Sequence, residues 1–284
     1  MNTDVERIKL FGYFGGKYFM LDDIMDVIVK IINKYDIKTV VDVFGGSGTV
    51  ILSLPLIYQV NRVYNDIDKR LVNVLKVLID NEKREKVLTS LEYAISSRDL
   101  FNEFKNSDWD NLSDEDMAIR FLYLLAYSFN GDLKTYKHNI NVVKDSMNVL
   151  INNIKRNWKY VRQLIYIENL DFRNIIKKYS GEHTLFYLDP PYLSGGRNYK
   201  YSFNIQDFID LKMLLDKSNS YYILNSSDVD FKEIIEIFGE PTFVNEYVNM
   251  FGDHRTYRKE GFWIKGNNLK DSDFNINGVM KDER

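Results

Sequence analysis

Cysteine is absent from the 284-residue chain, and proline and histidine are scarce, with four and three residues. Without cysteine the chain has no disulfide, no thiolate metal site and no cysteine nucleophile. The histidines are scattered, without HExxH or paired spacing, so we expect no bound metal ion. The longest apolar runs, such as 121–127, fall far short of the roughly 20 residues that span a bilayer, so we expect no membrane association.

Charge of one sign does not dominate, because the formal net charge is −3 at pH 7. This balance carries no overall signature of nucleic-acid binding, so binding to a polyanion would require a local basic patch. The first residues, MNTDVERIKLFGYFGGK, are charged where a signal peptide has an apolar run. We therefore expect a soluble, cytoplasmic protein, long enough for one large domain with a smaller insertion.

Short runs rich in β-branched and aromatic residues alternate with helical patterns, which is typical of an α/β fold. The expected strands are 38–44, 62–66, 164–167, 184–188, 221–224, 242–248 and 262–264. They predict a Rossmann-like, mostly parallel sheet with helices on both faces. Between Asp68 and Tyr160 the patterns are only helical, and Ser113 with Asp116 resembles a helix-capping box. We interpret residues 1–68 and 164–284 as the main domain and 69–163 as a helical insertion.

A glycine-rich turn and two acidic residues follow expected strands. In VDVFGGSGT the glycines would let the backbone approach a ligand closely where a helix begins. Asp66 ends the next strand about 20 residues later, where an acid commonly accepts the hydroxyls of a ribose. Asp171 in NLDF could accept from an adenine amine while Phe172 packs against the ring. Each feature alone can be explained as a turn or a helix N-cap. Together they indicate a crevice that binds a nucleoside. Because the sequence has no GKS or GKT phosphate loop, we expect this nucleoside to carry no long phosphate chain.

The stretch LFYLDPPYLSGG ends an apolar strand on an aspartate, two prolines and a tyrosine. Pro190 and Pro191 make the backbone here rigid. They therefore fix the positions of several hydrogen-bond acceptors, including the Asp189 carboxylate and the Pro190 carbonyl. Two acceptors against the hydrogens of an exocyclic amine would favour a pyramidal nitrogen and release its lone pair. Tyr192 offers a face for stacking, and a base inside a duplex must be swung out to reach it.

YFGGK at 13–17, FGGSG at 44–48 and DPPY at 189–192 occur in an order that resembles the Dam-type family of DNA adenine-N6 methyltransferases. The resemblance implies a class I methyltransferase fold, S-adenosylmethionine as methyl donor, S-adenosylhomocysteine as product, and no metal. It implies a catalytic strip of Asp189, Pro190, Pro191 and Tyr192. The residues that it implies for donor binding are Tyr13, Phe14, Lys17, Asp42, Phe44, Gly46, Gly48, Asp66, Asp171, Phe172 and Asp189.

The helical insertion is the expected target-recognition region. Residues 134–162 are basic with interleaved aromatics, which suits phosphate contacts and stacking, although a solvated helix face has the same composition. SFNGDLKTYKHN resembles the start of the family's target-recognition region, but the Arg and GxFNVP that usually follow are not found, so a GATC site is not implied. RTYRKEGFW is either a DNA contact or a sheet edge. The residues assigned to DNA binding are Asn130, Lys134, Tyr136, Lys137, Arg156 and Tyr199.

These features predict an adenine-N6 methyltransferase that acts on a specific sequence in double-stranded DNA. Its expected setting is the cytoplasm of a prokaryotic or phage-infected cell, as a monomer or weak dimer, with a cognate restriction endonuclease as a candidate partner. Cytosine N4 is the first alternative target, since its amine poses the same problem, although those enzymes more often have Ser at position 189. RNA or a protein amide follows. A non-catalytic DNA-binding protein is the other alternative, and the intact DPPY argues against it.

Overall fold

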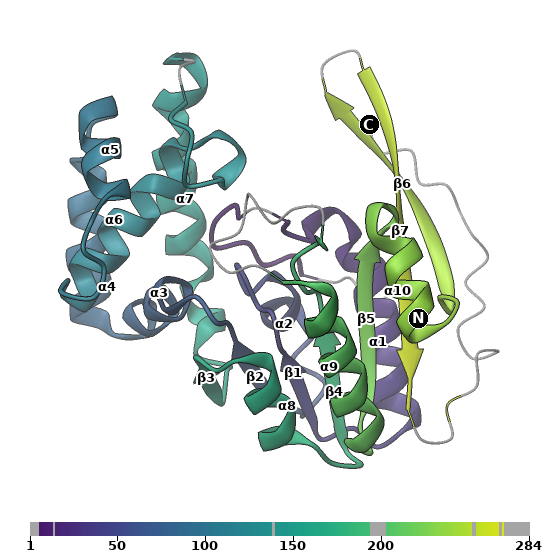
Figure 1. Cartoon of the computed structure of the whole chain (residues 1–284). Helices are drawn as coiled ribbons and strands as arrows, with labels where there is room; N and C mark the ends of the chain where they lie inside the picture. Colours follow the sequence, from purple (N-terminus) through teal and green to yellow (C-terminus); the bar gives the residue numbers. More distant parts are fainter. Residues whose placement is uncertain are drawn as a thin grey trace. The chain divides into compact units, whose positions relative to one another are not determined.

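The computed structural model describes residues 6–13, 15–137, 140–193, 203–251, 254–266 and 269 of the chain (Figure 1). Its strands belong to a seven-stranded sheet, in which the described pairs are parallel except for the two that β7 makes. The prediction of a mostly parallel α/β fold is therefore confirmed. The chain divides into two compact units, one with residues 1–25 and 45–169 and the other with residues 26–44 and 170–284.

The second unit contains five strands in the order β1-β4-β5-β7-β6. Strands β4 and β5 are buried along their whole length, as expected for central parallel strands. In their register Asp42 lies opposite Tyr187, and Leu188 lies opposite Leu224, so the carboxyl ends of β1, β4 and β5 meet at one edge. The bounds are β1 (Thr39–Asp42), β4 (Thr184–Leu188), β5 (Tyr221–Ser227), β6 (Phe243–Phe251) and β7 (His254–Lys265).

The helices of this unit lie on both faces of its strands. Figure 1 shows α8, α9 and α10 in front of the strands and α1 behind them. Polar caps fix where two of them begin: Asp171 caps α8, and Asn204 forms a reciprocal capping box with Asp207 at the start of α9. The bounds are α1 (Leu21–Lys34), which begins in the first unit, α8 (Phe172–Tyr179), α9 (Ile205–Lys217), η4 (Asp228–Asp230) and α10 (Phe231–Phe238).

The first unit is mainly helical and carries one parallel strand pair, β2 with β3. Helix α6 is buried from Met117 to Tyr127 apart from two half-buried residues, and α3, α4, α5 and α7 pack around it. As predicted, the described part of 69–159 contains no strand, only the isolated bridge between Ser128 and Tyr136. The bounds are η1 (Tyr18–Met20), α2 (Thr49–Ser53), β2 (Asn61–Asn65), α3 (Lys69–Ile79), α4 (Asn81–Glu92), α5 (Arg98–Lys105), α6 (Asp114–Tyr127), η2 (Phe129–Gly131), α7 (Ile140–Val161) and β3 (Tyr166–Glu168).

The segment RTYRKEGFW belongs to β7, which pairs with β5 on one side and with β6 on the other. It is therefore an interior strand, and the alternative of a sheet edge is wrong. The physical reason is that β6 pairs with β7 at nine positions, among them the buried residues Glu260 and Phe262. Within the described ranges, none of the helices combines the length and the apolar character that a bilayer span requires.

The start of α3 depends on a buried ion pair, which gives a first prediction. Asp68 caps the helix by accepting from the Arg70 backbone N–H at 3.0 Å, and it also accepts from the Arg70 guanidinium at 2.5–3.1 Å. Asp68→Ala should lower the free energy of unfolding by roughly 3 kcal/mol, because it removes a cap and the carboxylate that balances a buried cation. Urea unfolding followed by circular dichroism measures the change.

Asp110→Ala is the matched control. Asp110 also pairs with a basic residue of α3, Lys69, but its side chain is 84% exposed, so its removal should leave stability almost unchanged. Equal effects of the two substitutions would contradict the assignment of stability to the buried pair.

Candidate active site

The glycine turn after β1 is shaped by contacts with β2. Gly46 and Gly48 have φ of 52° and 75°, values that disfavour any residue with a Cβ. A Cβ on Gly45 would lie 2.3 Å from the Tyr64 ring, so only glycine fits there. Tyr64 donates through its hydroxyl to the Gly46 carbonyl at 2.7 Å, and Gly45 N donates to Asn65 O at 2.8 Å. Gly45 and Tyr64 were not assigned from the sequence, although Gly45, the first glycine of FGGSG, was a usable signal.

Asp66 is held against this turn by two backbone donors. Its Oδ2 accepts from Gly46 N at 2.9 Å, and its Oδ1 accepts from Asp68 N at 2.8 Å. Burial raises the pKa of Asp66 to about 6, although both backbone N–H groups act to lower it. Each carboxylate oxygen has a second lone pair, so the group can still accept from hydroxyls of a ligand. Asn169, another residue not assigned from the sequence, donates to the Asp66 backbone carbonyl at 2.7 Å.

Tyr13 also reaches the glycine turn. Its ring would lie 3.4 Å from a Cβ at Gly46, and its carbonyl accepts from Gly16 N at 3.1 Å. Lys17 is only 4% exposed, and its Nζ lies 3.5 Å from the Gly15 carbonyl. The structure thus brings Tyr13, Gly46 and Asp66 together in the first unit, with Lys17 in the same N-terminal turn. Phe14 lies outside the described residues.

In the second unit, aromatic rings gather around Phe44. Its ring centroid lies 6.0 Å from that of Phe172, another aromatic residue assigned to donor binding from the sequence. Phe203, which is 8% exposed and was not assigned from the sequence, lies 5.2 Å from Phe172 and 5.5 Å from Phe44. Asp171, the neighbour of Phe172, is the N-cap of α8, so the interpretation of this acid as a helix cap is confirmed.

The DPPY strip leaves the buried strand β4 and is anchored beyond it. Tyr192 donates through its hydroxyl to Glu260 Oε1 at 3.4 Å, and Leu193 N donates to Asp230 Oδ2 at 2.8 Å. Glu260 and Asp230 are both 2% exposed, on β7 and at the end of η4. Neither residue was predicted from the sequence, because strand pairing and turns far along the chain bring each of them to the strip.

Negative charge surrounds the end of β4. Tyr187 is fully buried, and among the residues that the structure describes its hydroxyl has no hydrogen-bond partner. Its pKa is raised well above the ordinary value by burial and then by Asp189, Asp42 and Glu260. Three carboxylates near one buried point favour a cationic ligand group such as a sulfonium. No group of three histidine or acidic side chains that could hold a metal ion occurs in the described part of the chain.

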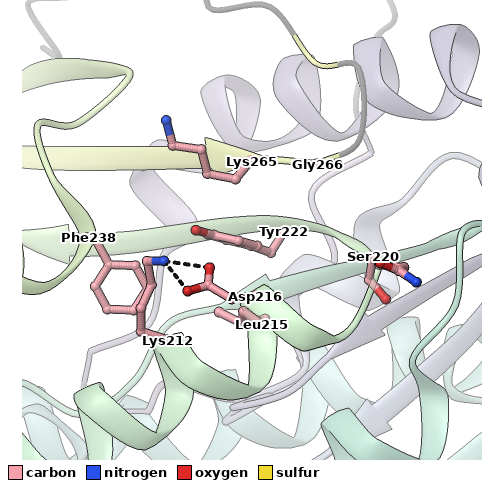
Figure 2. Close-up of a pocket in the computed structure, with 9 residues that line it drawn as sticks. Lys212, Leu215, Asp216, Ser220, Tyr222, Phe238, Lys265 and Gly266 are labelled. Atoms are coloured by element: carbon pink, nitrogen blue, oxygen red, sulfur yellow. Dashed lines mark hydrogen bonds and ion pairs between the residues drawn. The ribbon is translucent and has the colours of Figure 1, made fainter.

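A cavity of about 240 Å³ lies elsewhere in the second unit (Figure 2). It is lined by Tyr222 near the start of β5 and by Lys265 at the end of β7, which are paired in the sheet. This is the strand end opposite to the one that leads into Asp189. The cavity is therefore separate from the acceptor strip. An ion pair on α9, between Lys212 and Asp216, also lines it.

Comparison with known proteins decides between the alternative targets. Residues 13–245 match the sequence profile of the D12 class N6 adenine-specific DNA methyltransferases. The chain belongs to this family. The Type II methyltransferase M.MjaIII of Methanocaldococcus jannaschii is 28% identical over 293 residues, covering 88% of this chain and 94% of that protein. The resemblance drawn from YFGGK, FGGSG and DPPY is thus confirmed, and with it adenine methylation of DNA.

The residues assigned to DNA binding in this D12-class methyltransferase differ in exposure. Tyr136 bonds to Ser96 and packs edge-on against Phe101. Lys137 is half-buried, donates to the Ala126 carbonyl and to Ser146, and has its pKa lowered by burial. Both therefore hold their loop onto the helices. The remaining assigned residues that the structure describes lie exposed on the surface: Asn130, Lys134 and Arg156. Tyr199 lies outside the described residues.

Proposed function

We propose that this D12-class methyltransferase transfers a methyl group from S-adenosylmethionine to N6 of an adenine swung out of duplex DNA. The observation that carries the proposal is the acceptor strip at the end of β4, which Asp230 and Glu260 fix and which lies among buried carboxylates. Asp189 and the Pro190 carbonyl accept from the two N6 hydrogens, and Tyr192 stacks on the base.

The chain's own groups hold the amine and manage its proton. The N6 lone pair forms the new N–C bond as the donor's S–C bond breaks, and one N6 proton then leaves past Asp189 to solvent. Pro190 is buried, so its carbonyl oxygen is held in a fixed position as the acceptor for the amine. When bound, S-adenosylmethionine supplies a methyl group activated by a positively charged sulfonium, which the nearby carboxylates favour.

The proposed donor-binding residues fit such a ligand. The glycine positions need positive φ or close backbone approach, and with Phe44 they are assigned to the methionine part of the donor. Asp66 is a fixed acceptor for ribose hydroxyls, and Phe172 offers aromatic surface for adenine. We assign donor binding to Tyr13, Phe14, Lys17, Asp42, Phe44, Gly46, Gly48, Asp66, Asp171, Phe172 and Asp189.

The helical insertion is proposed to read the DNA sequence, mainly through Asn130, Lys134 and Arg156, which are exposed, and with Tyr199 on the segment after DPPY. The relative M.MjaIII is named a Type II methyltransferase, which supports a place in a restriction–modification system with a cognate endonuclease. The enzyme is proposed to act in the cytoplasm, as a monomer or weak dimer.

A direct test is transfer of radiolabelled methyl from S-adenosylmethionine to unmodified duplex DNA, followed by nucleoside analysis. The label should appear in N6-methyladenine. Label in N4-methylcytosine, or in a protein or RNA substrate alone, would overturn the proposal. Base-modification sequencing of DNA from an expressing host then gives the recognition sequence.

A further inference from the structure

One guanidinium in the second unit binds three carboxylates. Arg173 donates from Nη2 to Asp207 Oδ1 at 2.6 Å, and from Nε and Nη2 to Asp210 Oδ2 at 2.9 and 2.7 Å. Its Nη1 lies 3.4 Å from both oxygens of Asp171. The fork of donors is thus fully engaged, which only arginine can do, because lysine lacks the planar geometry.

The same guanidinium lies over the ring of Phe172, with Cζ 4.3 Å from the ring centroid. A cation at this distance from an aromatic face is attracted to it, so the contact restrains the ring as well as the charge. Phe172 and Asp171 are the two residues assigned to the donor's adenine. Arg173 therefore touches both of them while its other contacts point to α9.

The two oxygens of Asp171 differ in their contacts. Oδ1 accepts from the Arg173 backbone N–H at 2.8 Å and so serves as the cap of α8. Within the described part of the chain, Oδ2 has only the 3.4 Å contact with Nη1, a length at which a hydrogen bond is weak. Since the Asp171 side chain is 41% exposed, Oδ2 is the oxygen left to accept from an adenine amine.

Arg173 also fixes the start of α9. Asp207 belongs to the capping box of this helix, in which Asn204 N donates to Asp207 Oδ2 at 2.9 Å. Phe203, one residue before the cap, packs on Phe172. The Arg173 side chain thus connects Asp171 and Phe172 to the start of α9.

We infer that Arg173 is a positioning residue that makes the donor site selective for the 6-amino group of adenine. This inference rests on the proposed function and adds the means of selectivity. Arg173 directs Oδ2 of Asp171 at the base edge, while Asp207 and Asp210 on α9 hold the guanidinium in place. An amine, which donates, is favoured at that edge, whereas a 6-oxo group, which accepts, faces a carboxylate and is rejected.

The test uses calorimetry on the full chain with two ligands, S-adenosylhomocysteine and S-inosylhomocysteine, in which a 6-oxo group replaces the amine. The wild-type protein should bind the adenosyl compound at least roughly tenfold more tightly. Arg173→Lys should weaken adenosyl binding by roughly tenfold and change inosyl binding little, so the preference shrinks. Asp210→Asn, which loosens the fork on the side away from Asp171, should reduce the preference by a smaller factor.

Arg120→Lys is the matched control, because Arg120 also lies over a phenylalanine, Phe104, and donates to a side chain, Ser107. It should leave the preference unchanged. An equal loss for both ligands in Arg173→Lys and Asp210→Asn, or an undiminished preference in both, would show a merely structural role and overturn the inference. Absence of adenosyl binding by the wild-type protein would instead overturn the proposed function and the inference with it.

Discussion

Asp189→Ala is expected to lower methyl transfer to DNA by roughly a thousandfold or more, while S-adenosylhomocysteine still binds. The reason is that, in the proposed mechanism, the Asp189 carboxylate accepts from the amine of the target base, and its charge matters most as positive charge develops on N6. Donor binding depends instead on a larger set of groups, among which Asp66 and the glycine turn remain intact. Single-turnover transfer of labelled methyl, together with calorimetry of S-adenosylhomocysteine, separates the two effects.

Glu182→Ala is the control for this substitution, because Glu182 is an exposed acid just before the same strand. It should keep wild-type activity. If Asp189→Ala retained a tenth of the wild-type rate, the acceptor strip would not be the source of catalysis. If it lost donor binding as well, Asp189 would act mainly on the donor.

The parts of the fold that were predictable are those in which local pattern and burial agree. Strand β4 has the predicted bounds, Thr184–Leu188, because a continuous apolar run is typical of a strand that is buried on both faces. Strand β5 extends beyond the prediction to Ser227, since its polar end, Asn225 to Ser227, is buried by pairing with β7. Such pairing joins residues more than thirty positions apart, and no local pattern reports it.

The site divides in the same way. Asp66 and Gly46 could be assigned together from the sequence because each follows a strand, and the structure joins them by a hydrogen bond. Glu260 was not assigned, because tertiary structure places it beside Tyr192. Arg173 follows Phe172 directly in the sequence, but its carboxylate partners lie on a neighbouring helix and could not be read from local pattern. Composition also assigned Tyr136 to DNA binding without showing which way its side chain points.

Donor affinity is expected to fall as the pH is lowered through about 6, because Asp66 must be ionised to accept from ribose hydroxyls and its pKa is about 6. At pH 5 roughly nine in ten molecules would carry a proton on this carboxyl, so the dissociation constant should be roughly tenfold higher than at pH 7.5. Asp66→Asn should bind S-adenosylhomocysteine weakly at both values and lose the dependence. Calorimetry at pH 5 and at pH 7.5 measures all four affinities.

The stability of the ligand-free protein should change in the opposite direction. The folded state holds the Asp66 proton more tightly than the unfolded chain, whose pKa is near 3.8, so this group's contribution is greatest below pH 3.8 and is lost as the pH rises through about 6. The rise in melting temperature caused by S-adenosylhomocysteine should therefore grow from pH 5 to pH 7.5 in the wild-type protein. Asp171→Asn provides the comparison, because it weakens binding while leaving Asp66 in place and should keep the pH dependence. A wild-type affinity that is the same at pH 5 and pH 7.5 would show that Asp66 does not hold the ribose as an anion.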